Sequence, residues 1–359
     1  MGISLTIAQA TIAQAADEIV RVDVFQSGRD GYHTYRIPAL VVAADRSLLA
    51  FCEGRKTSRA DHGDVDLVLR RSQDGGRSWS RLQVVFEIGN TSKITIGNPC
   101  PVVDRQTNRI WLPFTRDNDR VYITSSADHG KTWEPPREIT RMVKAADWTW
   151  YATGPGTGIQ LRRKPYAGRL VIPCDHRVRG AGTRANSTRS HVIYSDDHGQ
   201  TWQAGQATDW RMNECAVAEL ADGQLLLNMR SNRGKQRRAI AWSRDGGQSW
   251  SPPIEDETLI EPVCQASLIA TAHQRTPGCL LFCNPASTSQ RARLTLRASR
   301  DAGRTWSSGR VIDPGAAAYS SLAELPNQEV GVLYERGGYR ALTFVRLSWQ
   351  GLVSQSPAR

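Results

Sequence analysis

The chain has 359 residues, of which 40% are hydrophobic and 23% charged, a balance that predicts a packed globular core rather than disorder. No run of 18 or more apolar residues occurs, so no membrane-spanning helix is expected. The formal charge of +11 rests on 40 arginines and six lysines, which favours an anionic partner, but no zinc-finger or RRM signature indicates nucleic acid.

The first segment, residues 1–17, is mildly apolar and ends in Ala13-Gln14-Ala15, a small-residue pattern that precedes secretory cleavage sites. No lysine or arginine precedes Arg21, so the basic start of a signal peptide is missing. Three interpretations stay open: a signal peptide, the remnant of one, or a plain tail. From this segment we expect a secreted or periplasmic protein, with the cytoplasm as the alternative.

One eight-residue pattern, Ser-x-Asp-x-Gly-x-Ser/Thr-Trp, dominates the rest of the chain. It occurs five times, at residues 72–79, 126–133, 195–202, 243–250 and 299–306. Aspartate bonds to nearby backbone and glycine adopts positive φ, which is the chemistry of a tight turn. Strand-like runs such as 65–69 and 191–194 precede the turns, and the tryptophan returns as a large apolar plug. Each copy therefore predicts a β-hairpin.

The spacing of the copies predicts how many units the chain holds. Their first serines are 54, 69, 48 and 56 residues apart, about 57 on average, which is the length of a four-stranded propeller blade. Residues 18–359 hold six such periods and no linker, so we expect one domain. The last unit lacks a copy of the pattern but has strand-like runs at 330–334 and 342–346. The early run 20–25 is expected to pair with this unit.

The seven cysteines show no CxxC spacing, so neither a zinc site nor a redox motif is expected. Most lie in apolar runs, which favours buried free thiols, with a disulfide between some pair as the alternative. They are Cys52, Cys100, Cys174, Cys215, Cys264, Cys279 and Cys283.

The five copies of the eight-residue pattern, called boxes from here on, resemble the repeats of the Asp-box (BNR-repeat) exo-sialidases, or neuraminidases, a family of glycoside hydrolases. The resemblance covers roughly residues 21–346. It implies an all-β fold, a six-bladed β-propeller with four-stranded antiparallel blades and five Asp-box turns. In that family the boxes are turns remote from the active site, and they also occur in propellers that are not enzymes. They predict the fold and not the reaction.

The resemblance also implies how the carboxylate of sialic acid is bound. Arginine forks suit carboxylates because each can donate two parallel hydrogen bonds. Arg36 lies in the motif at 35–38, and Arg230 follows Glu214 by sixteen residues. The third arginine is Arg291, with Arg293 as the alternative. Glu335 matches the glutamate that orients the first arginine.

The resemblance implies three catalytic residues: Tyr319 as nucleophile, Glu214 as the acceptor of its proton, and Asp61 as general acid and base. Asp64 and Asp66 are nearby competitors of Asp61. Sialidases are an exception among glycosidases in using a tyrosine nucleophile. We infer the reason: a carboxylate nucleophile would be repelled by the substrate's own carboxylate, whereas a phenol is neutral.

Three further residues match substrate-binding positions: Glu53, Arg55 and Asn98, the last of which stands where many bacterial members carry aspartate. The segments 150–156 and 173–176 are expected on the rim of the site. Neither a cofactor nor a metal is implied, since the seven histidines are dispersed and no phosphate-binding glycine loop occurs.

The sequence thus predicts an exo-α-sialidase that hydrolyses terminal sialic acid from glycoproteins, glycolipids or oligosaccharides, with retention of configuration. We expect a monomer without a nucleic-acid partner. A non-catalytic sialic-acid-binding propeller, a protein-interaction propeller and a trans-sialidase are the alternatives. A lectin needs the arginines but not Tyr319 paired with Glu214, whereas hydrolysis and transfer differ only in how water is excluded.

Overall fold

A computed structural model describes residues 20–89, 93–272 and 278–353. The tail at residues 1–17 lies outside them. The described strands form five antiparallel sheets. The first contains β2 (Thr34–Val42), β3 (Leu48–Arg55), β4 (Val65–Ser72) and β5 (Gln83–Phe86). The second contains β6 (Ile96–Gly97), β7 (Val102–Val103), β8 (Ile110–Arg116), β9 (Arg120–Ser126) and β10 (Arg137–Glu138).

The next two sheets continue in chain order. One contains β11 (Trp148–Thr153), β12 (Ile159–Gln160), β13 (Leu170–Val178), β14 (Thr188–Ser195) and β15 (Gln203–Ala204). The other contains β16 (Met212–Glu219), β17 (Leu225–Ser231), β18 (Arg237–Ser243) and β19 (Ile254–Ile260). Short helices α1 (Thr140–Val143), η1 (Pro326–Gln328) and α2 (Gln350–Val353) lie outside the sheets.

The fifth sheet has seven strands in the order β1-β25-β24-β23-β22-β21-β20. They are β20 (Ser267–Ala270), β21 (Leu280–Pro285), β22 (Ala292–Ser299), β23 (Arg310–Leu325), β24 (Glu329–Arg336), β25 (Ala341–Ser348) and β1 (Val20–Gln26). The predicted strands near both ends of the chain are confirmed, and β1 pairs antiparallel with β25, as expected.

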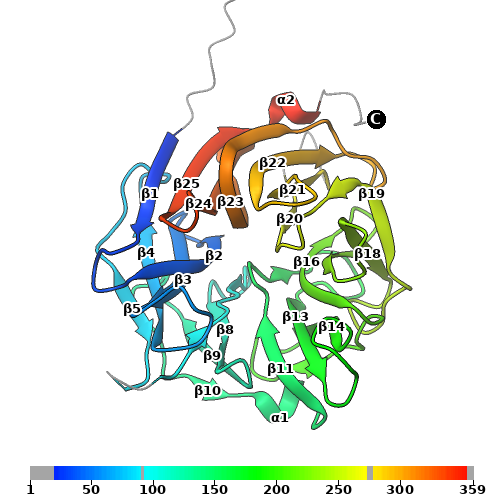
Figure 1. The fold of residues 1–359 in the computed structure, drawn as a ribbon, viewed down its shortest axis with the longest axis horizontal. Helices are drawn as coiled ribbons and strands as arrows, with labels where there is room; N and C mark the ends of the chain where they lie inside the picture. The colour runs from blue at the N-terminus through cyan, green and yellow to red at the C-terminus, as the bar shows by residue number, and fades with distance from the viewer. Residues whose placement is uncertain (1–19, 90–92, 273–277, 354–359) are drawn as a thin grey trace, which may run out of the picture.

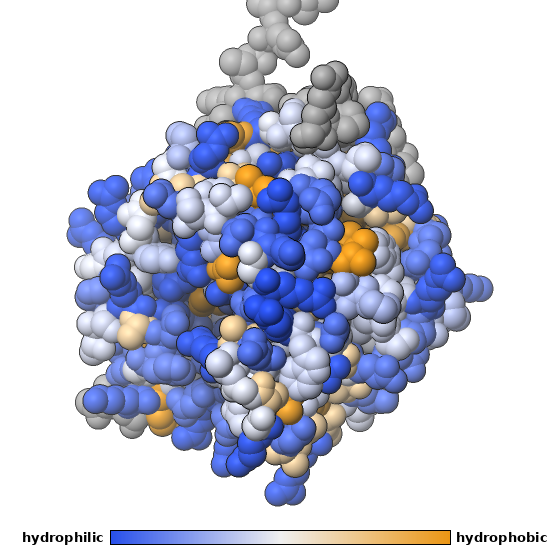
Figure 2. Space-filling view, turned by 45° about the vertical axis from the view of Figure 1, so that its right-hand side comes forward, coloured by the Kyte–Doolittle hydropathy of each residue, from blue (hydrophilic) through white to orange (hydrophobic). Residues whose placement is uncertain are grey.

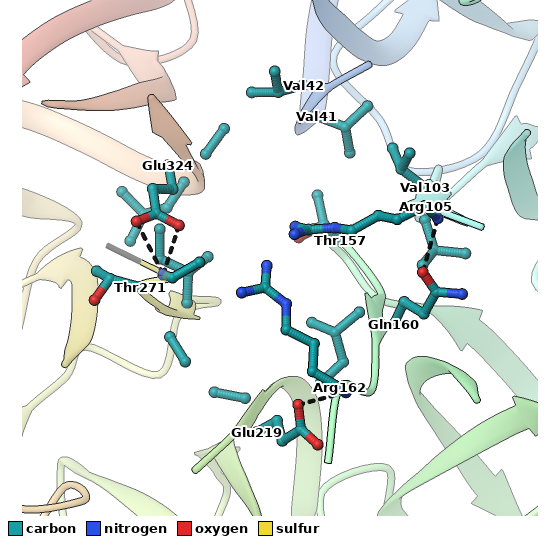
Figure 3. Close-up of a pocket in the computed structure, with 18 of the residues that line it drawn as sticks. Val41, Val42, Val103, Arg105, Thr157, Gln160, Arg162, Glu219, Thr271 and Glu324 are labelled. Atoms are coloured by element: carbon teal, nitrogen blue, oxygen red, sulfur yellow. Dashed lines mark hydrogen bonds between the residues drawn. The ribbon is translucent and has the colours of Figure 1, made fainter. Parts of the chain in front are cut away.

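The sheets are arranged in a ring around a central axis, the arrangement of a β-propeller, with β2, β16, β20 and β23 nearest the centre (Figure 1). The face of the molecule shown in Figure 2 is mostly hydrophilic, with small scattered hydrophobic areas. No helix in the described part of the chain is long and apolar enough to cross a membrane. At one end of the central strands the ring encloses a cavity of about 670 Å³ (Figure 3).

The five repeated boxes share one hydrogen-bond pattern. In each, the serine hydroxyl donates to the aspartate carboxylate at 2.7–2.8 Å and accepts the N–H of the glycine. The same carboxylate accepts the hydroxyl and N–H of the Ser or Thr that precedes the tryptophan. The aspartate therefore organises the turn through its side chain, which explains why the sequence repeats it.

Gly76, in the first box, should not tolerate a side chain. Its φ is +91°, and an added Cβ would lie 2.0 Å from Cε1 of Phe344. We expect Gly76→Ala to lower the free energy of unfolding by about 2–4 kcal/mol, from left-handed strain plus overpacking, as measured by denaturant titration. Gly28→Ala is the control, because Gly28 has φ +78° but nothing within 4 Å of its added Cβ. Equal losses in the two variants would mean that the contact with Phe344 contributes nothing.

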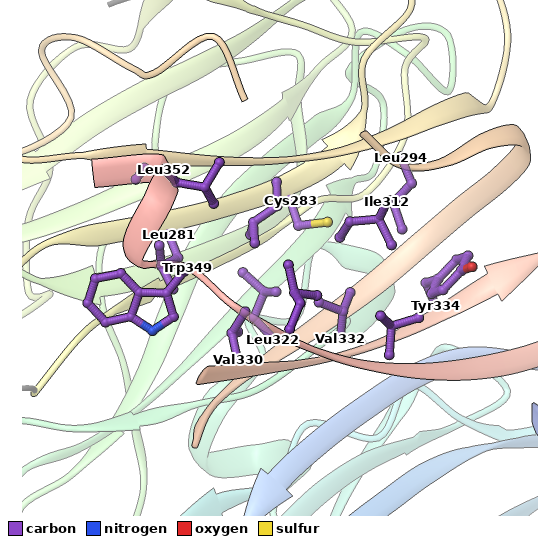
Figure 4. Close-up of a cluster of buried hydrophobic side chains, with 14 of the residues drawn as sticks. Leu281, Cys283, Leu294, Ile312, Leu322, Val330, Val332, Tyr334, Trp349 and Leu352 are labelled. Carbon is purple, nitrogen blue, oxygen red and sulfur yellow. The ribbon is translucent and has the colours of Figure 1, made fainter. Parts of the chain in front are cut away.

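The core consists of apolar clusters within and between the sheets. The cluster of Figure 4 lies between β21, β22, β23 and β24, and Trp349 and Leu352 close it at the start of α2. Trp349 is fully buried, and burial of each such side chain stabilises the fold by about 1.5–3 kcal/mol. All seven cysteines are buried free thiols, so that prediction is confirmed and the disulfide alternative is wrong.

Candidate active site

The ring brings the predicted site residues together at one end of the central strands. Arg36 lies near the start of β2, Glu214 near the start of β16, and Tyr319 within β23. Glu335 lies near the C-terminal end of β24. These residues are up to 299 positions apart in the chain, so only the closed ring makes them neighbours.

Tyr319 forms a closed triangle with Glu214 and Arg230. Its hydroxyl donates a short hydrogen bond to one carboxylate oxygen of Glu214 and accepts one from Nη1 of Arg230 at 3.2 Å. The same nitrogen donates to the other oxygen of Glu214 at 2.7 Å. Burial, and then the charge of Glu214, raise the pKa of Tyr319 well above its usual value, while Arg230 and Arg291 oppose the shift. The phenol is therefore neutral and oriented.

Glu335 ties three parts of the site together. It accepts two hydrogen bonds from the Arg36 guanidinium, at 2.6 and 3.3 Å. It also accepts the backbone N–H groups of Ile37 at 3.0 Å and Tyr319 at 3.1 Å. Ile37 has a φ of 60°, a strained conformation for a β-branched residue, which such anchoring holds in place. The buried carboxylate thus fixes both the arginine and the backbone of the tyrosine.

The three predicted carboxylate-binding arginines surround Tyr319. The Cζ atoms of Arg36 and Arg291 lie 5.2 and 5.4 Å from its ring centroid, and Arg230 contacts its hydroxyl. Arg36 and Arg230 are each paired with a glutamate. Arg291 has no carboxylate partner in residues 20–89, 93–272 and 278–353, where Tyr339 accepts its hydrogen bond at 3.1 Å. Arg291 therefore presents a guanidinium without a carboxylate partner next to a neutral phenol.

Asp61 lies at the exposed edge of this cluster. Its carboxylate accepts a hydrogen bond from Nη1 of Arg55 at 2.9 Å and lies 3.7 Å from Nη1 of Arg36, while its side chain is 68% exposed. Partial burial alone would raise the pKa of Asp61, but the charges of Arg55 and Arg36 hold it below its ordinary value. The competitors Asp64 and Asp66 instead form ion pairs with Lys56, both at 3.2 Å.

Glu53, Arg55 and Asn98 form a buried network beside Asp61. One oxygen of Glu53 accepts two hydrogen bonds from Arg55, and the other accepts the backbone N–H of Asn98 at 3.0 Å. A Cβ on Gly97 would lie 2.4 Å from that second oxygen, so the glycine is needed for the close approach. The Asn98 amide donates to Thr115 at 2.9 Å. The network leaves one end of Arg55 directed at Asp61.

One residue of the site, Tyr339, has no counterpart in the sequence analysis, and another, Asp175, was expected only as part of the rim segment 173–176. Tyr339 lies under the Arg36 guanidinium, 4.2 Å from Cζ to ring centroid, and hydrogen-bonds to Arg291. Asp175 accepts a hydrogen bond from the side chain of Asn213 at 2.7 Å, directly before Glu214. The signal that could have revealed its role is a carboxylate in the middle of β13, directly after the apolar run 170–174.

The expectation that the segments 150–156 and 173–176 lie on the rim is wrong, because residues 151–156 and 173–176 are all buried. Tyr151, Asp175 and His176 are fully buried. His176 stacks on Trp148 and bonds to His191, whose other ring nitrogen bonds to the Tyr151 hydroxyl at 3.0 Å. Aromatic bodies with polar tips can be buried when those tips find partners, which the sequence pattern did not reveal.

The geometry separates the two alternatives for the third arginine. Arg291 is partly buried against Tyr319 and Tyr339, whereas Arg293 is exposed with a φ of 58°. We expect Arg291→Lys to raise KM for a carboxylate-bearing substrate at least about tenfold, because lysine cannot reproduce the planar fork. Arg293→Lys is the matched control and should change KM less than twofold. Steady-state kinetics measure both, and a larger effect at Arg293 would reverse the assignment.

Comparison with known proteins gives a consistent result. Residues 46–332 match the family model described as a BNR repeat-like domain. The chain is 37% identical over 354 residues to a sialidase of Micromonospora viridifaciens, covering 92% of this chain but only 54% of that protein. A solved Hadza microbial sialidase is 31% identical, with a TM-score of 0.85 over 92% of this chain and 69% of that chain. An intramolecular trans-sialidase from Ruminococcus gnavus, 17% identical with a TM-score of 0.78, covers 93% of this chain and 98% of that one and shares the fold.

Proposed function

The chain belongs to the sialidase family with BNR repeats, and from this premise we propose that it is an exo-α-sialidase, a hydrolase that removes terminal sialic acid from glycans. One observation carries the proposal: a buried tyrosine hydroxyl is held between Glu214 and Arg230 inside a cluster of three arginines. A neutral nucleophile among three guanidinium groups suits a substrate whose reacting carbon bears a carboxylate.

The proposed reaction begins with the substrate carboxylate binding to Arg36, Arg230 and Arg291. The Tyr319 oxygen then attacks the anomeric carbon while Glu214 accepts its proton, so that phenolate character develops only during the attack. Asp61 protonates the departing oxygen of the aglycone. Water, deprotonated by Asp61, next displaces the tyrosine, whose oxygen takes back its proton from Glu214 as the bond breaks. Two inversions at the anomeric carbon give net retention through a tyrosyl intermediate.

We propose that Glu335 and the Glu53–Arg55–Asn98 network position these groups. Glu335 holds Arg36 and the backbone of Tyr319 with one carboxylate, so carboxylate binding and nucleophile placement are coupled. Arg55 donates a hydrogen bond to Asp61 at 2.9 Å and so holds its carboxylate in place. Such support reduces the reorganisation that the transition state would otherwise require.

The proposed architecture is one domain of six four-stranded blades. In the seven-stranded sheet, residues 310–316 of β23 pair with β22 and residues 317–325 pair with β24. Counting β23 as shared by two blades divides that sheet into two, and the five boxes then supply five of the six blades with turns. The predicted monomer and the secreted or periplasmic location are proposals of the same kind.

The test is to incubate the protein with sialyllactose and follow the products by proton NMR. We expect free sialic acid to appear first as the α-anomer and then to mutarotate, because retention delivers the anomer of the substrate. First appearance of the β-anomer would contradict the tyrosyl intermediate. No release at any pH would favour a binding propeller, and sialylation of an added galactoside acceptor in preference to water would favour a trans-sialidase.

A further inference from the structure

The central strands that carry the site also line the cavity of Figure 3 at their other ends. Each of three strands contributes one residue to the candidate active site and another to the cavity lining. The site residues are Arg36 on β2, Glu214 on β16 and Tyr319 on β23. The corresponding cavity residues are Val41, Glu219 and Glu324. Each pair is five residues apart, about 16 Å along a strand. We propose that this cavity is a second binding site, for a small organic anion that bears a carboxylate or phosphate group.

Size and lining suit such a ligand. The cavity of about 670 Å³ falls within the range of small-molecule sites, about 300–1,000 Å³. Its walls are largely aliphatic, with Val41, Val42, Val103 and Ile269 among the residues that line it. A wholly polar ion such as phosphate alone would leave these walls without a partner, so the ligand needs an apolar body as well as a charge.

Two arginines supply the charge. The guanidinium groups of Arg105 and Arg162 point into the middle of the cavity from different elements, one from the turn before β8 and one from the segment after β12 (Figure 3). Neither guanidinium has a hydrogen bond or ion pair within the described ranges of the chain. Burial and the nearby charge of Arg162 lower the pKa of Arg105, and the charge of Glu324 only partly opposes this shift. Two facing cations without a shared anion repel each other, and a bound anion would relieve that repulsion.

The carboxylates in the cavity wall are already engaged elsewhere. Glu219 accepts the backbone N–H groups of Arg162 at 2.8 Å and Arg163 at 2.9 Å. Glu324 accepts the backbone N–H of Ala272 with both oxygens, at 3.0 and 2.8 Å. Glu219 therefore fixes the segment that carries Arg162 without pairing with its guanidinium. The arginine heads remain available to a ligand.

A buried polar layer separates the cavity from the candidate active site. The side chain of Gln265 donates to the carbonyl groups of Ser320 at 2.9 Å and Pro155 at 3.2 Å, and accepts the N–H of Ser320 at 2.9 Å. Ser267 and Ser320 are hydrogen-bonded beside it. On β23, Ser320 of this layer lies between Tyr319 and the cavity-lining Leu322, and we expect the two sites to bind independently.

Isothermal titration with phenyl phosphate, benzoate and neutral benzamide tests the proposal. The proteins are the wild type, the double variant Arg105→Gln/Arg162→Gln, and Arg141→Gln, which removes an exposed arginine of α1 remote from the cavity lining. We expect at least one anion, but not benzamide, to bind the wild type and Arg141→Gln, and to bind the double variant at least tenfold more weakly. Phenyl phosphate alone would identify a phosphate ligand and benzoate alone a carboxylate.

Anion binding at the candidate active site is common to all three proteins, so only the difference between them reports on the cavity. Hydrolysis of sialyllactose should stay within twofold in the double variant, and the titration can be interpreted even if no hydrolysis occurs. Identical isotherms in the wild type and the double variant, or an absence of binding in both, would overturn the proposal. If the double variant unfolds, Arg105→Gln alone is expected to weaken binding at least threefold, and an unchanged isotherm would have the same meaning.

Discussion

Tyr319→Phe should lower kcat for sialyllactose by on the order of 10³-fold or more, the scale found when a nucleophile is removed from a catalytic unit. The hydroxyl is the only atom of the side chain that the substitution removes. That hydroxyl contacts both Glu214 and Arg230, while the ring stays packed among the arginines. Binding should therefore survive, and the KM should change little. The loss would lie in the chemical step.

The matched control is Tyr334→Phe. Tyr334 is also buried, and its hydroxyl donates to Asp313 at 2.9 Å and accepts a hydrogen bond from Arg21, both of which lie outside the arginine cluster around Tyr319. We expect this variant to keep kcat within about threefold and to lose about 1 kcal/mol of stability. Natural sialosides are the right substrates, because a good aryl leaving group departs with less nucleophilic help. A kcat for Tyr319→Phe within tenfold of the wild type would remove Tyr319 from the role of nucleophile.

Much of the fold could be predicted because its signals are local. The aspartate, glycine and tryptophan of each box occur at fixed offsets, and a turn that is stabilised by its own side chains leaves the same pattern wherever it occurs. The pairing of β1 with β25 was predictable from the incomplete last unit. The division of β23 between two neighbours was not, because Asp313, Pro314 and Gly315, which usually mark a turn between strands, lie here inside one strand just before its partner changes.

Prediction of the site depended on a resemblance and not on local physics. With 40 arginines in the chain, no single one indicates a binding site, and the choice between Arg291 and Arg293 needed the structure. Tyr339 could not be found because most tyrosines are core residues. Its position depends on how the turn between β24 and β25 packs against Arg36 of β2. Asp175 was expected on the rim within the segment 173–176, and its hydrogen bond from Asn213 was missed because no local signal indicates which residue of the neighbouring sheet it contacts.

The second large effect is expected at Asp61, and it should depend on the leaving group. Asp61→Asn removes the proposed general acid while retaining size and exposure. We expect kcat for sialyllactose to fall by about 10²–10⁴-fold, the usual contribution of acid–base catalysis. An aryl sialoside needs little protonation of its leaving group, so its glycosylation step should fall much less. Steady-state kinetics with both substrates measure the ratio, and Asp64→Asn is the control, because Asp64 pairs with Lys56. Equal losses for both substrates would contradict the role of general acid.

The pH dependence of the wild type should reveal how substrate binding prepares this acid. A general acid must be protonated, yet Arg55 and Arg36 lower the pKa of Asp61 in the free protein. When the substrate carboxylate binds Arg36, it weakens the attraction across the 3.7 Å contact and covers an exposed side chain, and both changes raise the pKa. Since kcat/KM reports the free enzyme and kcat the bound one, kcat/KM should decline with rising pH at a lower pH than kcat does. Coincident declines would mean that the substrate carboxylate does not reach Arg36, and the proposed coupling between carboxylate binding and acid catalysis would be wrong.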